Sequence, residues 1–310
     1  LLPALVQQLK EYIIAIEQFN TRQPLMIQWV EKFRHSMLFH ITPVEVEENF
    51  KKIFYRQKAS FIFTSATLTV SSSFDYFLKP LGLKEIDKLI VPSPFDYQKQ
   101  ALLYLPRGLP DPRHLDYYEL LVKRVISIIK ACGGRTFFLF TSHSALKKVA
   151  HLLSNTLHYP LLIQGEEAKP ILLARFRSLE HAVLLGTSTF WEGVDVKGSL
   201  LSCVIIDKLP FASPKDPVVQ GKMSYLKAQG CSPFDDLSLP QAIIALKQGI
   251  GRLIRDISDQ GVLVIADPRL TGRAYGREIF ASLPLISKTR NEETVLQFIK
   301  NLALEHETTC

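Results

Sequence analysis

The chain has 310 residues, and its 37 lysine and arginine side chains against 30 aspartate and glutamate side chains leave a net charge of +7. With 47% hydrophobic and 22% charged residues it has the composition of a folded globular protein, which excludes wholesale disorder, a collagen-like repeat and a low-complexity chain. A prior of about 150 residues per domain predicts two domains, and the small positive excess permits a polyanion partner without demonstrating one.

Targeting and cysteine patterns narrow the class further. No apolar run reaches the roughly 18 residues that a membrane helix requires, and the N-terminus lacks the charged start and cleavage site of a signal peptide. The four cysteines form no Cys-x-x-Cys pair, which argues against a zinc site or a local iron–sulfur site. We therefore expect a reduced, cytoplasmic protein without a membrane segment or a metal site. Because residue 1 is leucine, we also expect a piece of a longer protein.

The N-terminal part reads as mostly helical. Apolar residues spaced at three and four predict an amphipathic helix over residues 1–20. Further helices are expected over residues 25–38 and 46–55, and an apolar strand over 60–64. Two prolines in residues 91–95 disfavour both helix and strand, so we place the main domain boundary there.

From about residue 100, short apolar strands alternate with helices. Helices are predicted over 115–130, 144–158, 170–178, 217–229, 240–256 and near 275–283, and strands over 135–140, 161–164, 182–185, 200–207 and 261–266. Such continuously apolar strands are typical of a parallel sheet that helices cover on both faces. The predicted fold class is therefore α/β.

The segment from Gln248 to Arg255 carries the strongest chemical signal. In a continuous helix, Gln248, Arg252 and Arg255 share one face, and two guanidinium groups on one face suit an oxyanion with several oxygens. Gly249 and Gly251 would each cost about 1 kcal/mol in that helix, which favours close approach of a ligand or another backbone. The alternative for a bare arginine pair is an exposed surface helix.

Hydroxyl-rich loops follow three of the predicted strands. Thr187 and Ser188 follow one strand, at the end where open α/β sheets place ligands, and Glu192 and Asp195 lie further along the same loop. Ser65, Ala66 and Thr67 follow a second strand, and Thr141 and Ser142 a third, although Ser142 can equally serve as a helix N-cap. As isolated residues, the two acids are more typical of loop caps or solvated charges.

The chain lacks two motifs that would complete a nucleotide site. No Gly-x-x-x-x-Gly-Lys-Ser/Thr loop and no Asp-Glu-x-His box for Mg²⁺ occur in the 310 residues. The residues that cradle the β- and γ-phosphates of a nucleotide are therefore not in this chain.

Five motifs in order nevertheless resemble the DinG/YoaA-like helicases, bacterial relatives of the XPD group in helicase superfamily two. They are Thr64-Ser-Ala-Thr-Leu68, Ser93-Pro-Phe95, Phe190-Trp-Glu-Gly-Val-Asp195, Leu209-Pro-Phe211 and Gln248-x-x-Gly-Arg-x-x-Arg255. The resemblance covers roughly residues 40–310. It implies two RecA-like motor domains that bind ATP with Mg²⁺ between them and move along single-stranded DNA from five-prime to three-prime, in DNA repair or replication.

The resemblance also implies a division of the chain. Residues 1–40 would be helical and end an arch-like insertion, 41–95 would be the tail of the first motor domain with motif III, and 96–310 would be the second motor domain with motifs IV, V and VI. The ligands of Mg²⁺, and any iron–sulfur cluster of the kind some members carry, would lie mostly upstream of this chain.

Site residues follow from the same resemblance. Arg252 and Arg255 would reach the γ-phosphate as arginine fingers. The rest of the nucleotide site would come from Gln248, Gly251, Glu192, Gly193 and Asp195. The DNA contacts would be Thr141, Ser142, Thr187 and Ser188, and the motif that couples hydrolysis to DNA grip would be Ser65, Ala66 and Thr67. Three alternatives stay open: a nucleic-acid-stimulated ATPase that does not unwind, a catalytically silent α/β nucleic-acid-binding or interaction module, and, least favoured, a small-molecule Rossmann enzyme.

Overall fold

The computed structural model describes residues 2–21, 23–54, 56–57, 59–187, 190, 196 and 198–308, and divides the chain into two compact units. Unit 1 comprises Leu1–Thr69, Ser73–Asp87 and Ala212–Pro240; unit 2 comprises Val70–Ser72, Lys88–Phe211 and Gln241–Cys310. We expected one boundary near residues 91–95, and a boundary lies close to it at 87/88. Residues 212–240, however, group with unit 1 and not with the C-terminal part. The assignment of these parts to two motor domains stays a prediction.

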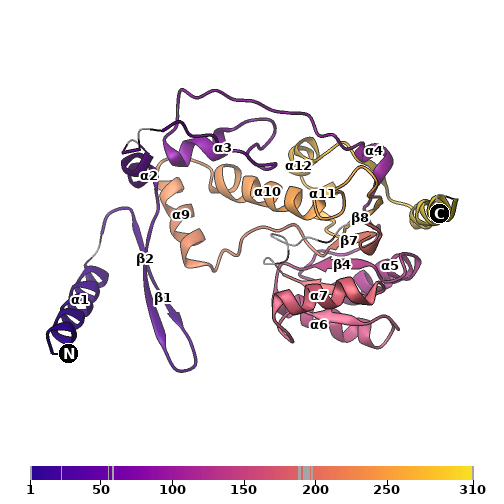
Figure 1. Cartoon of the computed structure of the whole chain (residues 1–310), viewed down its shortest axis with the longest axis horizontal. Helices are drawn as coiled ribbons and strands as arrows, with labels where there is room; N and C mark the ends of the chain where they lie inside the picture. Colours follow the sequence, from indigo (N-terminus) through magenta and orange to yellow (C-terminus); the bar gives the residue numbers. More distant parts are fainter. Residues whose placement is uncertain are drawn as a thin grey trace. The chain divides into compact units, whose positions relative to one another are not determined.

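Unit 2 is built on a seven-stranded, all-parallel sheet, which confirms the predicted α/β class (Figure 1). Its strand order is β5-β6-β4-β7-β8-β3-β9. The strands are β3 (Ala101–Tyr104), β4 (Thr136–Leu139), β5 (Leu161–Ile163), β6 (Val183–Gly186), β7 (Cys203–Ile206), β8 (Gly261–Ile265) and β9 (Ser287–Thr289). We predicted all of them except β3, an apolar run that our sequence analysis did not assign, and β9, which is three residues long and polar.

Helices cover both faces of this sheet. They are α4 (Tyr97–Gln100), α5 (Tyr117–Ala131), α6 (His143–Ser154), α7 (Lys169–Leu179), η2 (Gly198–Leu200), α10 (Leu239–Ile250), α11 (Arg269–Gly272), α12 (Gly276–Ser282) and α13 (Glu292–Thr308). Phe138 and Phe140 belong to a buried cluster with α5, α6 and α13. Phe137, one residue along β4, faces the other way and packs on Phe176 of α7 at 4.8 Å between ring centroids.

Unit 1 contains a two-stranded antiparallel hairpin, so our prediction of a helix over residues 25–38, and with it of a helical 1–40 segment, was wrong. The elements of this unit are α1 (Leu2–Asn20), β1 (Met26–Lys32), β2 (Met37–Pro43), α2 (Glu47–Phe54), α3 (Asp75–Leu78), η1 (Lys79–Leu81), α9 (Pro217–Ala228) and η3 (Phe234–Ser238). Trp29 stacks on His40, its cross-strand partner, with 3.9 Å between centroids. Aromatic and β-branched residues favour such pairing over a helix.

The expected strand over residues 60–64 is also absent, since these residues have no regular secondary structure. A strand needs a hydrogen-bonded neighbour, and no described residue pairs with this segment. Its phenylalanines pack on helices instead: Phe61 lies 4.3 Å from Phe54 of α2, and Phe63 lies 5.5 Å from Phe77 of α3. Residues 60–64 therefore contact α2 and α3 through aromatic side chains and not through strand pairing.

The helix predicted over residues 1–20 is present as α1, but none of its described side chains is buried. Its apolar residues, among them Leu5, Leu9 and Ile13, are each about half exposed. No helix in the described part of the chain is long and apolar enough to cross a membrane.

Candidate functional site

The loops at the carboxyl end of the parallel sheet hold several of the predicted residues. Thr141 and Ser142 follow β4 and are exposed. The backbone N–H of Thr141 donates to Oδ1 of Asp207, which follows the neighbouring strand β7, at 3.1 Å. Ser142 is the N-cap of α6, and its hydroxyl accepts from the N–H of Ala145 at 3.2 Å. The cap role that we left open for Ser142 is therefore real, and both residues stay within reach of solvent.

Thr187, which follows β6, is only 5% exposed. Its N–H and its hydroxyl both donate to Oε1 of Gln164, at 2.5 and 3.0 Å. Nε2 of His143, the first residue of α6, lies 3.5 Å from the same hydroxyl. Thr187 thus joins the ends of β5 and β6 to the start of α6.

Asp207 is a fully buried carboxylate next to this loop cluster. Burial raises its pKa to about 7, and Lys208, whose Nζ lies 3.6 Å from Oδ2, opposes that rise. The hydroxyl of Tyr117 donates to the backbone carbonyl of Asp207 at 2.5 Å and is 3.1 Å from that of Ala266. Nζ of Lys208 donates in turn to the hydroxyl of Tyr118 at 2.9 Å. This network fixes the ends of β7 and β8.

The segment of Gln248, Arg252 and Arg255 does not form a continuous helix, so our expectation of a helix over residues 240–256 with all three side chains on one face was wrong. Helix α10 ends at Ile250, and the N–H groups of Arg252 and Leu253 bond to carbonyls three residues back, which tightens the chain into turns. Gly249 and Gly251 favour this ending, since glycine loses more backbone conformational entropy in a helix than any other residue. Gln248 stays in α10, whereas both arginines lie beyond its end.

Asp259 and Gln100 hold the loop that carries Arg255. Oδ2 of the buried Asp259 accepts the N–H groups of Arg255 and Asp256 at 2.8 and 2.9 Å. Its other oxygen accepts the N–H of Gly198, 61 residues earlier, at 3.1 Å. The amide of Gln100 donates to the carbonyls of Asp256 and Asp259, each at 2.9 Å. The loop is thus fixed by buried polar contacts from two other parts of unit 2.

Ser65, Ala66 and Thr67 lie in unit 1 and form a short hydroxyl-capped turn. The hydroxyl of Ser65 accepts the N–H of Thr67 at 3.1 Å and lies 3.2 Å from its hydroxyl. Ser65 and Ala66 are exposed and Thr67 is partly so. The turn is stabilised locally, as in other Ser/Thr turns.

Four predicted site residues lie outside the described residues: Ser188, Glu192, Gly193 and Asp195. Of that loop, Phe190 is described and is buried, and a side chain on Gly186 would lie 2.7 Å from it. Among the described residues, no group of three or more His, Cys, Asp or Glu side chains is arranged to hold a metal ion.

Comparison with known proteins identifies the chain. The model of the helicase C-terminal domain matches residues 125–285, more than half of the chain. The chain belongs to the helicase C-terminal domain family. Among curated relatives, it is 44% identical over 277 residues to the ATP-dependent DNA helicase YoaA of Escherichia coli and 34% identical over 272 residues to the ATP-dependent DNA helicase DinG of Photobacterium profundum. The resemblance to DinG/YoaA-like helicases is confirmed.

The chain matches one part of each of these longer relatives. The alignment to YoaA covers 89% of this chain but 44% of YoaA, and that to DinG covers 84% and 39%. The chain thus spans less than half the length of these helicase relatives. Among solved structures, one titled XPD_Helicase shares the fold, with a TM-score of 0.60 at 17% identity over 82% of this chain and 48% of that chain.

Sequence reasoning missed the residues that position this helicase domain's loops. Asp207, Asp259, Gln100 and Gln164 each support a backbone segment from a distant part of the chain. The one signal available was an acid directly after an apolar strand, as Asp207 is after β7. Asp259 and Gln100 carry no such signal, because their partners are set by tertiary packing.

Proposed function

We propose that this chain is the C-terminal motor part of an ATP-dependent DNA helicase that moves along single-stranded DNA from five-prime to three-prime. Arg252 and Arg255 would act as arginine fingers, and Thr141 and Ser142 as backbone contacts to DNA. Support comes from family membership together with one observation in particular: the arginine loop after α10 is held by buried hydrogen bonds from Asp259 and Gln100.

That observation favours a catalytic role over a surface role. An exposed arginine pair with no function has no need of a carboxylate and an amide, both more than nine-tenths buried, to hold its backbone. Phosphoryl transfer depends mainly on positioned cations that neutralise charge on the transferring group. A loop whose backbone is fixed can present guanidinium groups with the accuracy that this chemistry requires.

The remaining assignments extend the proposal. Gln248, Gly251, Glu192, Gly193 and Asp195 would contribute to the nucleotide site. Ser188 and Thr187 would lie beside the DNA, with buried Thr187 acting by holding its loop to Gln164. Residues 65–67 would couple hydrolysis to DNA grip, and the protein would serve DNA repair or replication in the cytoplasm. The phosphate loop, the Mg²⁺ ligands and any iron–sulfur cluster would come from chain upstream.

The arginine fingers are tested by Arg252→Ala, Arg255→Ala and the double variant in the intact protein. We expect kcat for ATP hydrolysis to fall by about a hundredfold or more in the double variant, with less effect on ATP affinity, because such arginines act on charge that develops in the transition state. Arg277→Ala, at an exposed arginine on α12, is the matched control and should hydrolyse ATP like wild type. A loss below about threefold in the double variant would make the pair structural.

A catalytically silent nucleic-acid-binding module is the alternative. It predicts no DNA-stimulated ATP hydrolysis by the intact protein, and no loss of function when Arg252 is replaced. Strand displacement measured beside ATP hydrolysis separates a helicase from an ATPase that moves without unwinding.

A further inference from the structure

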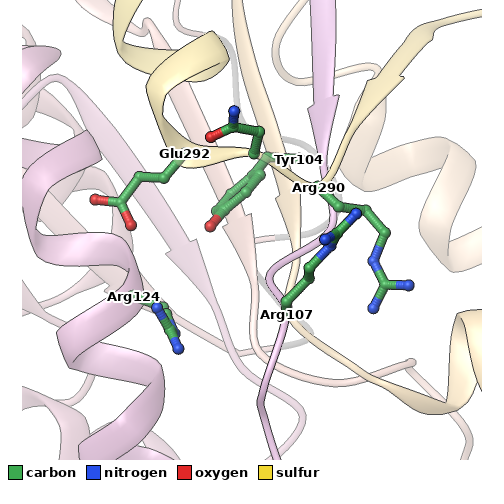
Figure 2. Close-up of a pocket in the computed structure, with 6 residues that line it drawn as sticks. Tyr104, Arg107, Arg124, Arg290 and Glu292 are labelled. Carbon is green, nitrogen blue, oxygen red and sulfur yellow. The ribbon is translucent and has the colours of Figure 1, made fainter.

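A cavity of about 390 Å³ lies at the carboxyl ends of strands β3 and β9, and no motif residue discussed above lines it (Figure 2). Three separate segments contribute to it: the end of β3 with its loop, helix α5, and the turn from β9 into α13. We call it the arginine cavity; its lining residues are Tyr104, Arg107, Arg124, Arg290, Asn291 and Glu292.

The charge of the arginine cavity is not balanced within the protein. Among the described residues, no hydrogen bond or ion pair engages Arg107, Arg124 or Arg290. Glu292 is the one carboxylate in the lining, and it accepts a hydrogen bond from the hydroxyl of Ser127 at 2.5 Å. Three guanidinium groups against one carboxylate leave a net charge of two positive around one space, an arrangement that favours an anion.

Tyr104 adds a hydrogen-bond donor to the arginine cavity. Its side chain belongs to a residue that is only 2% exposed, yet among the described residues its hydroxyl has no hydrogen-bond partner. Figure 2 shows the hydroxyl directed into the space between the arginine side chains. Burial raises the pKa of this phenol, so it stays protonated and can donate. The hydroxyl lines the cavity, so a ligand bound there can accept its hydrogen bond without displacing a protein partner.

The backbone around the cavity is shaped to hold these groups. Gly108 has a positive φ of 75°, and a side chain there would lie 3.3 Å from Nη2 of Arg124. The side chain of Asn291 accepts the N–H of Glu293 at 3.0 Å and so caps the first turn of α13. The N–H of Leu105 bonds to the carbonyl of Thr289 at 3.0 Å, which extends the β3–β9 ladder up to the cavity.

The position of the arginine cavity points to its ligand. All strands are parallel, so β3 and β4 end at the same edge of the sheet, and three strand spacings separate them, about 14 Å. A strand of DNA at Thr141 and Ser142 therefore needs only a short extension to reach the cavity. Guanidinium forks bind phosphate oxygens in pairs, and the negative charge of a phosphodiester offsets part of the positive excess in the cavity.

We propose that the arginine cavity binds a backbone phosphate of the DNA strand, at a site beyond the motif residues; this rests on the function proposed above. Arg107, Arg124 and Arg290 supply the charge, and the hydroxyl of Tyr104 donates one further hydrogen bond. Because phosphate contacts carry no base information, the site adds affinity without sequence preference.

The test compares four forms of the intact protein: wild type, the triple variant Arg107→Ala/Arg124→Ala/Arg290→Ala, Tyr104→Phe, and the control Arg277→Ala. Fluorescence anisotropy measures the binding of labelled deoxythymidine oligomers, short and long, over a range of salt concentrations. The three arginines are exposed, so the triple variant should fold, and its melting temperature checks this.

We expect the triple variant to bind long oligomers about tenfold more weakly. The slope of log K against log salt should also become shallower, by about 0.7 for each phosphate contact that is lost. Short oligomers that reach only Thr141 and Ser142 should bind the triple variant as tightly as they bind wild type. Tyr104→Phe should lose less affinity for long oligomers than the triple variant does, and Arg277→Ala should lose none. If the triple variant matches Arg277→Ala at every length, the proposal fails while the helicase function stands. If wild type binds no single strand at all, both fail.

Discussion

Asp207 shows what one residue contributes to this domain beyond chemistry. Its carboxyl group accepts the N–H of Thr141, which joins the ends of β4 and β7, and it lies beside Lys208, the next residue along the chain. Burial raises its pKa from 3.8 to about 7. Asp207 therefore fixes the loop at a cost in folding free energy, because its charged form is disfavoured in the folded state.

This cost predicts how stability depends on pH. Between about pH 4 and pH 7, the folded state keeps a proton on Asp207 that the unfolded chain has released. The free energy of unfolding should therefore fall as pH rises through this window, by up to about 4 kcal/mol, and level off above it. Asp207→Asn, which keeps an acceptor for Thr141, should flatten that dependence in urea titrations at several pH values.

Asp87→Asn is the matched control, since Asp87 is exposed and makes no hydrogen bond or ion pair with any described residue. It should leave the pH dependence of wild type in place. An Asp207→Asn variant whose stability still falls between pH 4 and pH 7 like that of wild type would contradict the assignment.

At the scale of elements, the first residue of β8 packs closely against the backbone before β7 and against the loop after α10. Gly261 begins β8, and a Cβ there would lie 2.5 Å from the backbone carbonyl oxygen of Ser202 and 2.7 Å from Leu253. Leu253 belongs to the turn that carries the proposed arginine fingers. Backbone cannot move aside as a flexible side chain does, so glycine is required at this position.

Gly261→Ala should therefore destabilise unit 2 by about 1–3 kcal/mol, measured as a fall in melting temperature or in the free energy of unfolding. Gly272→Ala is the control, because Gly272 ends α11 with nothing within 4 Å of the added carbon. It should change stability by no more than about 0.5 kcal/mol. Equal effects of the two substitutions would show that the close approach costs nothing.

At the scale of the whole molecule, the chain holds the proposed arginine fingers but none of the residues that cradle the phosphates or Mg²⁺. An arginine finger acts only on a nucleotide that other groups have already positioned. We therefore expect the 310-residue chain by itself to show no sustained ATP hydrolysis with Mg²⁺ and single-stranded DNA. Phosphate release from a purified preparation, followed over many turnovers, is the measurement, and continuous release would refute this expectation.

Much of the fold was predictable because its signals are local. The five strands of unit 2 that we predicted are mostly apolar runs, α5, α6, α7 and α9 follow apolar periodicity, and α6 and α9 also have capping side chains, all of which can be read from neighbouring residues. Where the outcome depended on a distant partner, prediction failed. Residues 25–38 became a hairpin through cross-strand pairs such as Trp29 with His40, and residues 60–64 had no strand beside them.

The candidate site divides in the same way. The amino-acid sequence by itself determined the α/β class and the ordered motifs, because strand patterning and motif spacing are written along the chain. Only the tertiary structure decided that α10 ends at Ile250, that Asp259 joins the loop of Arg255 to Gly198, which lies 61 residues before Asp259, and that Arg107, Arg124 and Arg290 line one cavity. The physical reason is that the partners of buried polar groups, and the charges that gather around one space, depend on which segments the fold brings together, and distance along the chain does not specify those neighbours.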